Sequence, residues 1–302
     1  MPCQKIVRLL ILSLVACAAG NAQSPPVFDG QAALEATRHV VSFGPRRLGS
    51  AAHEQVRQWL KTELRQLPCE VGEDAFTART VLGPRAMTNL IAKFPGSSRR
   101  IVVLSGHYDT YDRPGLRFLG ANDGGSSTGI LLQLARSVAR SAHRDTIWIV
   151  WLDGEESLVN WSGEDHTYGS AHLARRWRSD GTAGSILALI NLDMIGDADL
   201  DLVYDLNSTV WLRDLVWSVA WRLGYSAQFP RDRPNAIADD HVPFAEIGIA
   251  ALDLIDLDYG PDNAYWHTAN DTMDKLSARS FGIVGQVVLE TLRVLEQRGS
   301  GG

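Results

Sequence analysis

The chain has 302 residues, of which 29 are lysine or arginine and 35 are aspartate or glutamate, and its net charge is −6. This balance excludes the basic surface that nucleic-acid binding requires, and a hydrophobic content of 45% is typical of a globular protein with a sizeable core. Because no linker-like stretch divides the chain, we expect one large α/β catalytic domain over residues 27–299.

The N-terminal segment is typical of an export signal. A basic start, an apolar segment at 9–19 that is too short to span a bilayer and a small-residue site ending at Ala22 predict a signal peptide over residues 1–22. The residues that end at Cys17 also fit a bacterial lipoprotein signal, whose processing would leave Cys17 lipidated. We therefore expect a secreted or periplasmic protein, or alternatively a membrane-anchored lipoprotein, with no transmembrane span in the mature chain.

Hydrophobic periodicity predicts helices that alternate with strands along the rest of the chain. The expected helices cover residues 29–41, 52–67, 128–140, 168–177, 209–223 and 280–295. The expected strands cover residues 69–81, 87–94, 100–105, 146–152, 185–191, 201–204 and 249–255. The strand at 146–152 is apolar along its length, as expected of a central strand covered on both faces. The alternation predicts a three-layer α/β/α fold with a mostly parallel central sheet.

Two adjacent glutamates follow that central strand. Glu155 and Glu156 come directly after the apolar run, where like charges repel and burial penalises both carboxylates. A divalent metal ion would supply the missing counter-charge, with one glutamate as a ligand and its neighbour free for proton transfer. The alternative is a pair of solvated glutamates in an ordinary turn, since Asp-Gly-Glu is also a common turn sequence.

Four more acidic or imidazole residues lie near the ends of predicted strands. His107 and Asp193 follow two of these strands, Asp123 lies in a glycine-rich loop, and His267 follows the last strand through a loop. Each has an ordinary reading alone: a buried histidine, a turn or cap carboxylate, or packing beside Trp266. The carboxyl ends of parallel strands meet at one edge of a sheet, so we expect these residues to lie together with the glutamates. Imidazole and carboxylate groups are zinc ligands, and the set predicts a zinc site.

A competing catalytic motif lies at residues 125–129, where Gly-Ser-Ser-Thr-Gly fits the G-x-S-x-G pattern of serine hydrolases. That pattern requires a strand directly before the serine and a helix directly after it. The nearest predicted strand ends far upstream, so the beginning of a helix explains the segment better.

The metal-site motifs resemble those of zinc-dependent exopeptidases, the family that contains bacterial zinc aminopeptidases and animal-type glutaminyl-peptide cyclotransferases. The similarity extends from residues 44–46 to the closing helix. It rests on Gly-His-Tyr-Asp at 106–109, Ala-Asn-Asp-Gly-Gly at 121–125, Asp-Gly-Glu-Glu at 153–156, Asn-Leu-Asp-Met-Ile-Gly at 191–196 and Trp-His-Thr at 266–268. The resemblance implies that Glu155 is the general acid/base in either branch of the family.

The resemblance implies the metal ligands but not the number of zinc ions. In the cyclotransferases one zinc ion is held by the residues that match Asp123, Glu156 and His267. In the aminopeptidases the residues that match His107 and Asp193 complete a second zinc site, and the match to Asp123 bridges the two ions. All five residue types are present here, so the ligands alone do not separate the two branches.

Residues around the metal ligands favour the cyclotransferase branch. The loop at 157–167, with Trp161, resembles a cyclotransferase loop that carries a pocket tryptophan, and Trp266 matches a second pocket tryptophan. Asp239 stands where the aminopeptidases usually have serine. Each of these residues also has an ordinary alternative, because the tryptophans could be core residues and Asp239 could cap the helix that begins near Val242.

We therefore expect a glutaminyl-peptide cyclotransferase that acts on peptide or protein N-termini. The resemblance implies that Glu155 transfers the proton, that Asp193 and Asp239 form a hydrogen-bonded acidic network, and that Trp161 and Trp266 wall the pocket. The alternative is a di-zinc aminopeptidase. A non-enzymatic metal-binding module is disfavoured, because Glu155 is present beside every expected ligand.

Some positions depart from the cyclotransferase pattern. The segment after Asp123 is closer to the aminopeptidase style, and Asp253 stands where a pocket histidine is expected. Tyr259 takes the place of a pocket phenylalanine and is expected to bind substrate. Gly106 stands at the position of a cysteine, so the disulfide common in the family is not expected. These departures concern the pocket and leave the expected metal ligands unchanged.

Overall fold

The computed structural model describes residues 27–298. The predicted signal segment, including Cys17, lies outside the described residues. Cys69 is a free thiol. Within the described part of the chain, no helix combines the length and the apolar character needed to cross a bilayer.

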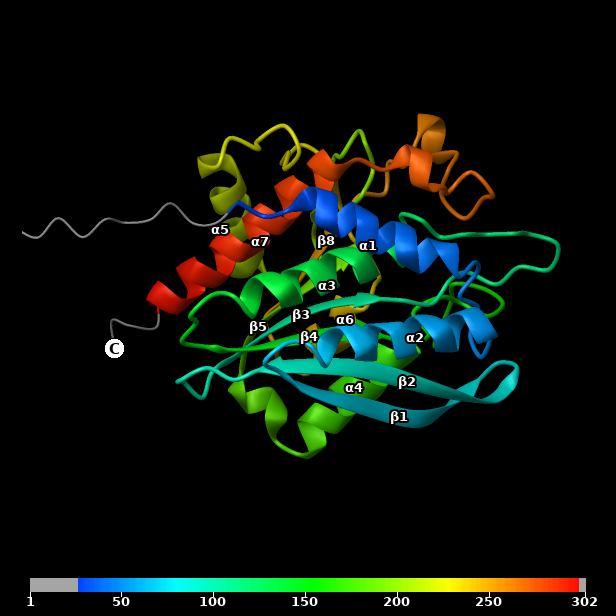
Figure 1. Cartoon of the computed structure of the whole chain (residues 1–302), viewed down its shortest axis with the longest axis horizontal. Helices are drawn as coiled ribbons and strands as arrows, with labels where there is room; N and C mark the ends of the chain where they lie inside the picture. The colour runs from blue at the N-terminus through cyan, green and yellow to red at the C-terminus, as the bar shows by residue number, and fades with distance from the viewer. Residues whose placement is uncertain (1–26, 299–302) are drawn as a thin grey trace, which may run out of the picture.

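A six-stranded sheet forms the centre of the fold (Figure 1). Its spatial order is β1-β2-β4-β3-β5-β8, and the strands are β1 (Glu70–Thr80), β2 (Gly83–Phe94), β3 (Ile101–His107), β4 (Thr146–Leu152), β5 (Ile186–Asp193) and β8 (Ala251–Ile255). The last four run parallel to one another, whereas β2 pairs antiparallel with both β1 and β4. The predicted mostly parallel sheet is confirmed, with a hairpin at one edge. A separate short pair joins β6 (Tyr204–Asp205) to β7 (Pro234–Asn235).

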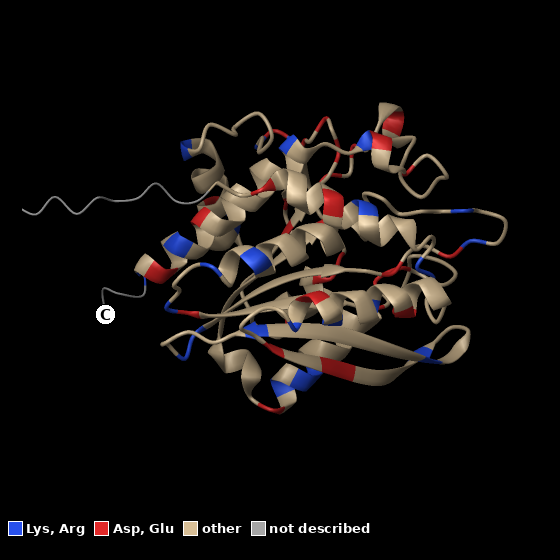
Figure 2. Ribbon diagram, viewed as in Figure 1, with Lys and Arg blue, Asp and Glu red and all other residues tan. Residues whose placement is uncertain are grey.

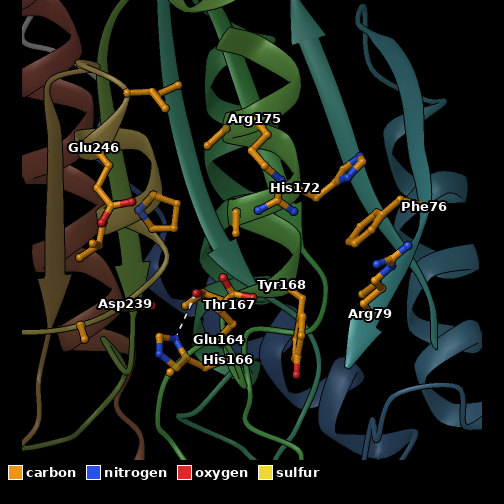
Figure 3. A pocket seen from close by; sticks show the side chains of 18 of the residues that line it. Phe76, Arg79, Glu164, His166, Thr167, Tyr168, His172, Arg175, Asp239 and Glu246 are labelled. Carbon is orange, nitrogen blue, oxygen red and sulfur yellow. Dashed lines mark hydrogen bonds between the residues drawn. The ribbon is translucent and has the colours of Figure 1, made fainter. Parts of the chain in front are cut away.

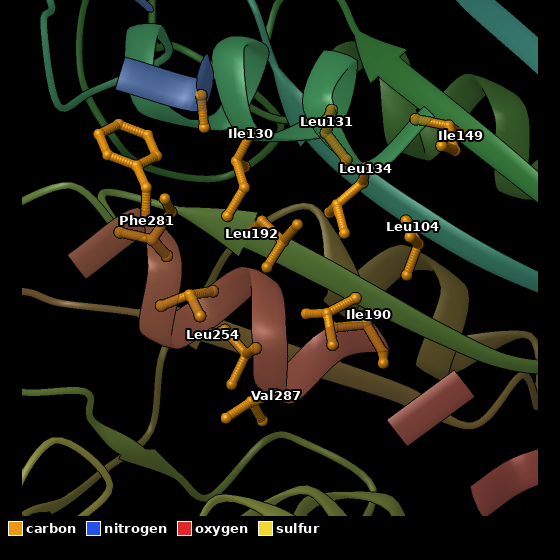
Figure 4. Close-up of a cluster of buried hydrophobic side chains, with 14 of the residues drawn as sticks. Leu104, Ile130, Leu131, Leu134, Ile149, Ile190, Leu192, Leu254, Phe281 and Val287 are labelled. Atoms are coloured by element: carbon orange, nitrogen blue, oxygen red, sulfur yellow. The ribbon is translucent and has the colours of Figure 1, made fainter. Parts of the chain in front are cut away.

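Helices cover both faces of the sheet, which confirms the three-layer architecture. The larger core contains side chains of α1 (Gly30–Ser42), α2 (Ala51–Leu64), α3 (Gly125–Val138), α5 (Val210–Arg222) and α7 (Ala278–Arg298). Figure 4 shows part of it, where Leu134 of α3 and Val287 of α7 lie near Leu104 and Ile190 of the sheet. The opposite face is covered by α4 (Tyr168–Ser179) and α6 (His241–Glu246).

Several element boundaries differ from the predicted ones. Strand β2 begins at Gly83 rather than at residue 87, because a two-residue turn joins it directly to β1. Gly83 has a φ of +89°, a conformation that favours glycine. The strand expected at 201–204 is reduced to β6. Three short 3-10 helices were not predicted, since they are too short to show a hydrophobic period: η1 (Thr182–Ser185), η2 (Pro261–Asn263) and η3 (Met273–Lys275).

The Gly-Ser-Ser-Thr-Gly segment forms the first turn of α3, as the sequence favoured. A Cβ atom on Gly129 would lie 2.1 Å from the Thr37 hydroxyl oxygen of α1, so glycine permits the close packing of the two helices. The Ser127 hydroxyl donates a hydrogen bond to Asp193 at 3.4 Å. Helix packing therefore explains the second glycine of the motif.

Candidate metal centre and active site

The parallel strands deliver the expected residues to one end of the sheet. Strand β3 ends at His107 and β5 ends at Asp193, while β4 is followed directly by the turn that carries Glu155 and Glu156. Asp123 lies in the loop just before α3. All five side chains are buried. These residues therefore lie together at the end of the sheet where the parallel strands finish, as the sequence predicted.

Three of the expected ligands converge on one point. The Nε2 atom of His267 lies 3.2 Å from Asp123 Oδ2 and 3.4 Å from Glu156 Oε2. A four-coordinate zinc ion with ligands at about 2.0–2.2 Å would separate its ligand atoms by about 3.3–3.6 Å. Within the described residues, Asp123 Oδ2 and both Glu156 oxygens are buried without a hydrogen-bond partner. The donor set, its spacing and its unpaired oxygens therefore fit a metal ion, and we call these residues the first triad.

A second triad shares Asp123 with the first. The Nε2 atom of His107 lies 3.2 Å from Asp123 Oδ1 and 3.2 Å from Asp193 Oδ1. Asp123 thus turns one carboxylate oxygen toward each triad. The arrangement has the form of a bridged two-metal site, and its donor atoms are spaced like those of the first triad.

A buried carboxylate holds the turn that carries the paired glutamates. Asp109 accepts hydrogen bonds from the backbone N–H groups of Glu155 and Glu156, both at 3.2 Å. Gly154, just before them, has a φ of +69°. The backbone of the turn is therefore fixed, and the two side chains are left for other contacts. Asp109 ends the Gly-His-Tyr-Asp motif, but the motif did not predict this role.

Glu155 has the properties of an acid/base group. Burial is the largest cause that raises its pKa, and the nearby carboxylates of Glu156 and Asp239 raise it further. His107 opposes the shift, with its Nδ1 atom 3.7 Å from Glu155 Oε2, but the pKa still lies well above the usual range. Glu155 therefore has a higher proton affinity than an ordinary glutamate.

The acidic network around Asp239 differs from the expected one. Asn191 donates hydrogen bonds from Nδ2 to Asp239 at 3.1 Å and to Asp253 at 3.2 Å. Among the described residues no direct hydrogen bond joins Asp193 to Asp239, and Asn191 connects Asp239 to Asp253. Burial raises the pKa of Asp253 well above its usual range, and the charge of Asp239 adds to the shift. Asp253, which stands where the family pattern has a pocket histidine, thus extends this acidic network.

A cavity of about 430 Å³ opens onto the first triad. Its lining includes Glu155, Asp239, Trp161 and Trp266. Both tryptophans are 40% exposed, which distinguishes them from core residues. Trp266 stacks on one side of the His267 ring at 4.3 Å between centroids, and Tyr111 stacks at 4.2 Å. The two aromatic rings therefore hold the His267 imidazole, a candidate metal ligand, in place as well as lining the cavity.

The expectation that Tyr259 lines the substrate pocket is wrong. Its side chain is fully buried and does not line the cavity. The Tyr259 hydroxyl donates a hydrogen bond to Asp271 at 2.8 Å. Asp271 in turn accepts from the backbone N–H groups of Asn122 at 2.8 Å and Asp123 at 3.2 Å. Tyr259 therefore supports the Asp123 loop from behind.

Arg46 supports the same loop from a distant part of the chain. Its guanidinium is fully buried and donates to the carbonyl oxygens of Tyr108 at 2.9 Å, Leu119 at 2.8 Å and Gly120 at 2.7 Å. A longer contact of 3.3 Å reaches the carbonyl of Asp123. The sequence marked Arg46 only as part of residues 44–46, where the resemblance begins, and did not predict this role.

The fold and the paired triads define a class of protein, the metal-dependent enzymes with an exopeptidase-like α/β/α core. The chain belongs to peptidase family M28, whose pattern it matches over residues 89–292. This result confirms the resemblance found in the sequence.

Individual relatives lie in both branches of the family. A glutaminyl-peptide cyclotransferase of Drosophila melanogaster is 30% identical over 252 residues, which cover 75% of this chain and 70% of the relative. The crystal structure of a glutaminyl cyclase from an Acidobacteriales bacterium has 40% identity and a TM-score of 0.88, covering 93% of this chain and 99% of that one. A zinc-dependent exopeptidase from Parabacteroides distasonis has 26% identity and a TM-score of 0.79, with coverages of 89% and 99%.

Proposed function

We propose that this protein is a zinc-dependent glutaminyl-peptide cyclotransferase, which converts the N-terminal glutamine of a peptide into pyroglutamate and releases ammonia. The observation that carries the proposal is the position of Glu155. This buried carboxylate borders both the first triad and a cavity lined by Trp161 and Trp266. The similarity to animal and bacterial glutaminyl cyclases over most of the chain supports it.

The reaction needs one proton to move between two nitrogen atoms. Asp123, Glu156 and His267 would hold a zinc ion, which would polarise the γ-carbonyl group of the glutamine. As the substrate's α-amine forms its bond to the γ-carbon, Glu155 would accept the proton that the amine loses. Glu155 would then give that proton to the side-chain nitrogen as its bond to carbon breaks, so that neutral ammonia leaves. Its raised pKa suits the second transfer.

The cavity wall would decide between cyclisation and hydrolysis. Water competes with the α-amine, and its attack on the same carbon would give glutamate instead of pyroglutamate. Trp161 and Trp266 would shield the γ-carbonyl group from water. The lining also includes apolar side chains, among them Val159 and Ile237.

A di-zinc aminopeptidase is the second candidate, and the second triad is the observation that favours it. His107 and Asp193 keep the same spacing to Asp123 as the first triad keeps. With both triads filled, Glu155 would instead take a proton from an attacking water molecule. About two zinc ions per chain at modest free zinc would support this candidate, and about one would support the cyclotransferase.

A direct comparison of two substrates tests the proposal. The zinc-loaded protein is incubated separately with a peptide that begins with glutamine and with a leucine anilide, and ammonia, pyroglutamate and free leucine are measured. We expect ammonia and pyroglutamate in equal amounts from the first substrate. Release of leucine without any pyroglutamate would overturn the proposal.

We also propose that the enzyme acts outside the cytoplasm. The composition of residues 1–22 supports this, and so does the lipoprotein-like segment that ends at Cys17. Mass spectrometry of the N-terminus of the exported protein tests the two forms. A chain that begins after Ala22 would support secretion, a lipid-modified Cys17 would support anchoring, and an unprocessed chain in the cytoplasm would refute both.

A further inference from the structure

A second cavity lies beside the active-site cavity and is larger, at about 870 Å³. It is bounded by the end of β1, by α4 and by α6, and its lining includes Arg79, Arg175 and Arg178. We call it the arginine groove. Figure 3 shows Arg175 on α4 between Arg79 on β1 and Glu246 on α6.

The arginine groove is continuous with the active site. Ala238 and Asp239 line both cavities. His166 lines the groove and stacks on Trp161 of the active-site cavity, with ring centroids 4.3 Å apart and an interplanar angle of 8°. A peptide whose first residue lies near Glu155 would therefore find the groove directly beyond Asp239.

The three arginines of the groove carry charges that no other described residue pairs with. All three are exposed, and none of their guanidinium groups forms an ion pair or hydrogen bond with another residue of the described chain. Arg176 on the same helix provides a contrast, because it bonds Asp74 at 2.5 Å and does not line the groove. Figure 2 shows this group of basic positions on α4, in a chain whose net charge is −6. Arg175 and Arg178 lie one turn apart, where like charges repel unless an anion binds between them.

Acidic residues of the groove do not neutralise these arginines. The acidic residues of the groove are Glu246 on the opposite wall, Glu164 on the loop before α4 and Asp239 at the border with the active-site cavity. None of them forms an ion pair with the three arginines. The wall made by β1 and α4 is therefore a cationic surface that faces an open cavity. Guanidinium groups bind carboxylates with paired hydrogen bonds, which makes a carboxylate the natural ligand.

We propose that the arginine groove binds acidic side chains of the substrate peptide downstream of the residue that is cyclised. This proposal rests on the proposed function. Helix α4 begins at Tyr168 beside the active site, and a rise of about 1.5 Å per residue places Arg175 and Arg178 roughly 10 and 15 Å along it. An extended peptide covers that distance in about three to five residues. The groove therefore selects substrates with acidic residues at about the fourth to sixth positions.

Three hexapeptide amides test the proposal. Each begins with Gln-Ala-Ala, followed by three glutamates, three serines or three lysines, and kcat/KM is measured by ammonia release with the zinc-loaded protein. At low salt we expect kcat/KM for the glutamate peptide to exceed that for the serine peptide by about tenfold, through KM, with the lysine peptide slowest. The preference should fall to within about twofold at 1 M salt, where the screening length is about 3 Å.

Variants locate the preference in the groove. In the triple variant Arg79→Gln/Arg175→Gln/Arg178→Gln, we expect the ratio of kcat/KM between the glutamate and serine peptides to fall to about one. Arg176→Gln is the matched control, because it removes a paired arginine from the same helix, and we expect it to keep the ratio. The ratio is measured within each preparation, so a partly folded variant does not alter it.

Failure of this proposal differs from failure of the proposed function. Equal cyclisation of the glutamate and serine peptides by the unmodified protein would overturn the role of the groove and leave the cyclotransferase intact. A preference that survives in the triple variant would also overturn it. If none of the three peptides releases ammonia, the proposed function fails, and the groove proposal fails with it.

Discussion

Replacement of Arg46 by methionine should destabilise both the fold and the metal site. Arg46 is fully buried and donates three hydrogen bonds of 2.7–2.9 Å to carbonyl oxygens on both sides of the loop that leads to Asp123. Burial lowers the pKa of Arg46 to about 10, and the charges of Asp271 and Asp123 oppose the shift. The side chain therefore stays protonated at neutral pH and offsets part of the local negative charge.

The size of the loss in stability follows from the carbonyl and charged groups that Arg46→Met leaves without partners. Each buried carbonyl that loses its donor costs about 1–3 kcal/mol, and removal of one member of a buried charged cluster typically costs about 3–5 kcal/mol. We expect Arg46→Met to lower the free energy of unfolding by roughly 3–6 kcal/mol, a large part of the total for a domain of this kind. Arg46→Lys keeps a charge and fewer donors, so its loss should be intermediate.

Urea unfolding and competitive zinc titration measure the two effects. Arg47→Met is the control, because Arg47 is partly exposed, pairs with Asp112 at 2.9 Å on the surface and donates one hydrogen bond to a carbonyl oxygen, that of Leu116 at 2.7 Å. Its expected cost is below about 1 kcal/mol. If Arg46→Met and Arg47→Met change unfolding and zinc affinity equally, then the buried guanidinium does not organise the Asp123 loop, and the reasoning is wrong.

Two further predictions concern proton transfer and pH. The variant Glu155→Gln should still bind zinc, as measured by metal analysis, but its kcat for the glutamine peptide should fall by about 10²–10⁴-fold. Full activity in this variant would show that Glu155 does not take part in catalysis. The variant Asp256→Asn tests how the stability of the fold depends on pH. Burial raises the pKa of Asp256 from 3.8 to about 7. Between about pH 4 and pH 7 the folded state therefore binds more protons than the unfolded state. The contribution of Asp256 to the free energy of unfolding therefore falls by about 1.4 kcal/mol per pH unit across that window, up to about 4 kcal/mol in all. The stability of Asp256→Asn relative to the unmodified protein should rise over the same window in urea unfolding, and a difference that is constant with pH would contradict the shift.

The sequence predicts the central strand and its glutamates well because both signals are local. The strand at 146–152 is apolar along its length, and a charged pair directly after such a strand is costly without a counter-charge. Because parallel strands end at the same edge of a sheet, the order of strands and helices along the chain is enough to place His107 and Asp193 beside that pair. Pattern and topology are therefore sufficient to predict that these residues gather at one edge of the sheet.

The supporting residues could not be predicted in the same way. Asp109, Asp271 and Arg46 support the site through bonds to backbone N–H or carbonyl groups. Backbone groups are the same at every position, so the sequence carries no sign of which segment a distant side chain will meet. The only signals were residues 44–46, where the resemblance begins, and the Gly-His-Tyr-Asp motif, which mark the positions of Arg46 and Asp109 without stating their roles.

Tyr259 illustrates the limit of a resemblance. The loop between β8 and His267 contains η2, in which Asp262 and Asn263 adopt positive φ angles of 53° and 58°. This path turns Asn263 toward the cavity and leaves Tyr259 behind it. The position of a residue along a loop does not determine which side chain reaches the pocket when the backbone makes such turns.

The shared carboxylate of Asp123 explains why the ligands cannot distinguish a cyclase from a peptidase. Either one or two ions fit the same donor atoms, so the difference must arise in the surroundings of Glu155. Asp239 lies in those surroundings, and its charge helps to raise the pKa of Glu155. An uncharged serine at that position would remove this contribution and favour the deprotonated form, which suits a base that activates water. A carboxylate there raises the proton affinity of Glu155, which suits a group that first takes the proton of the α-amine and then delivers it to departing ammonia.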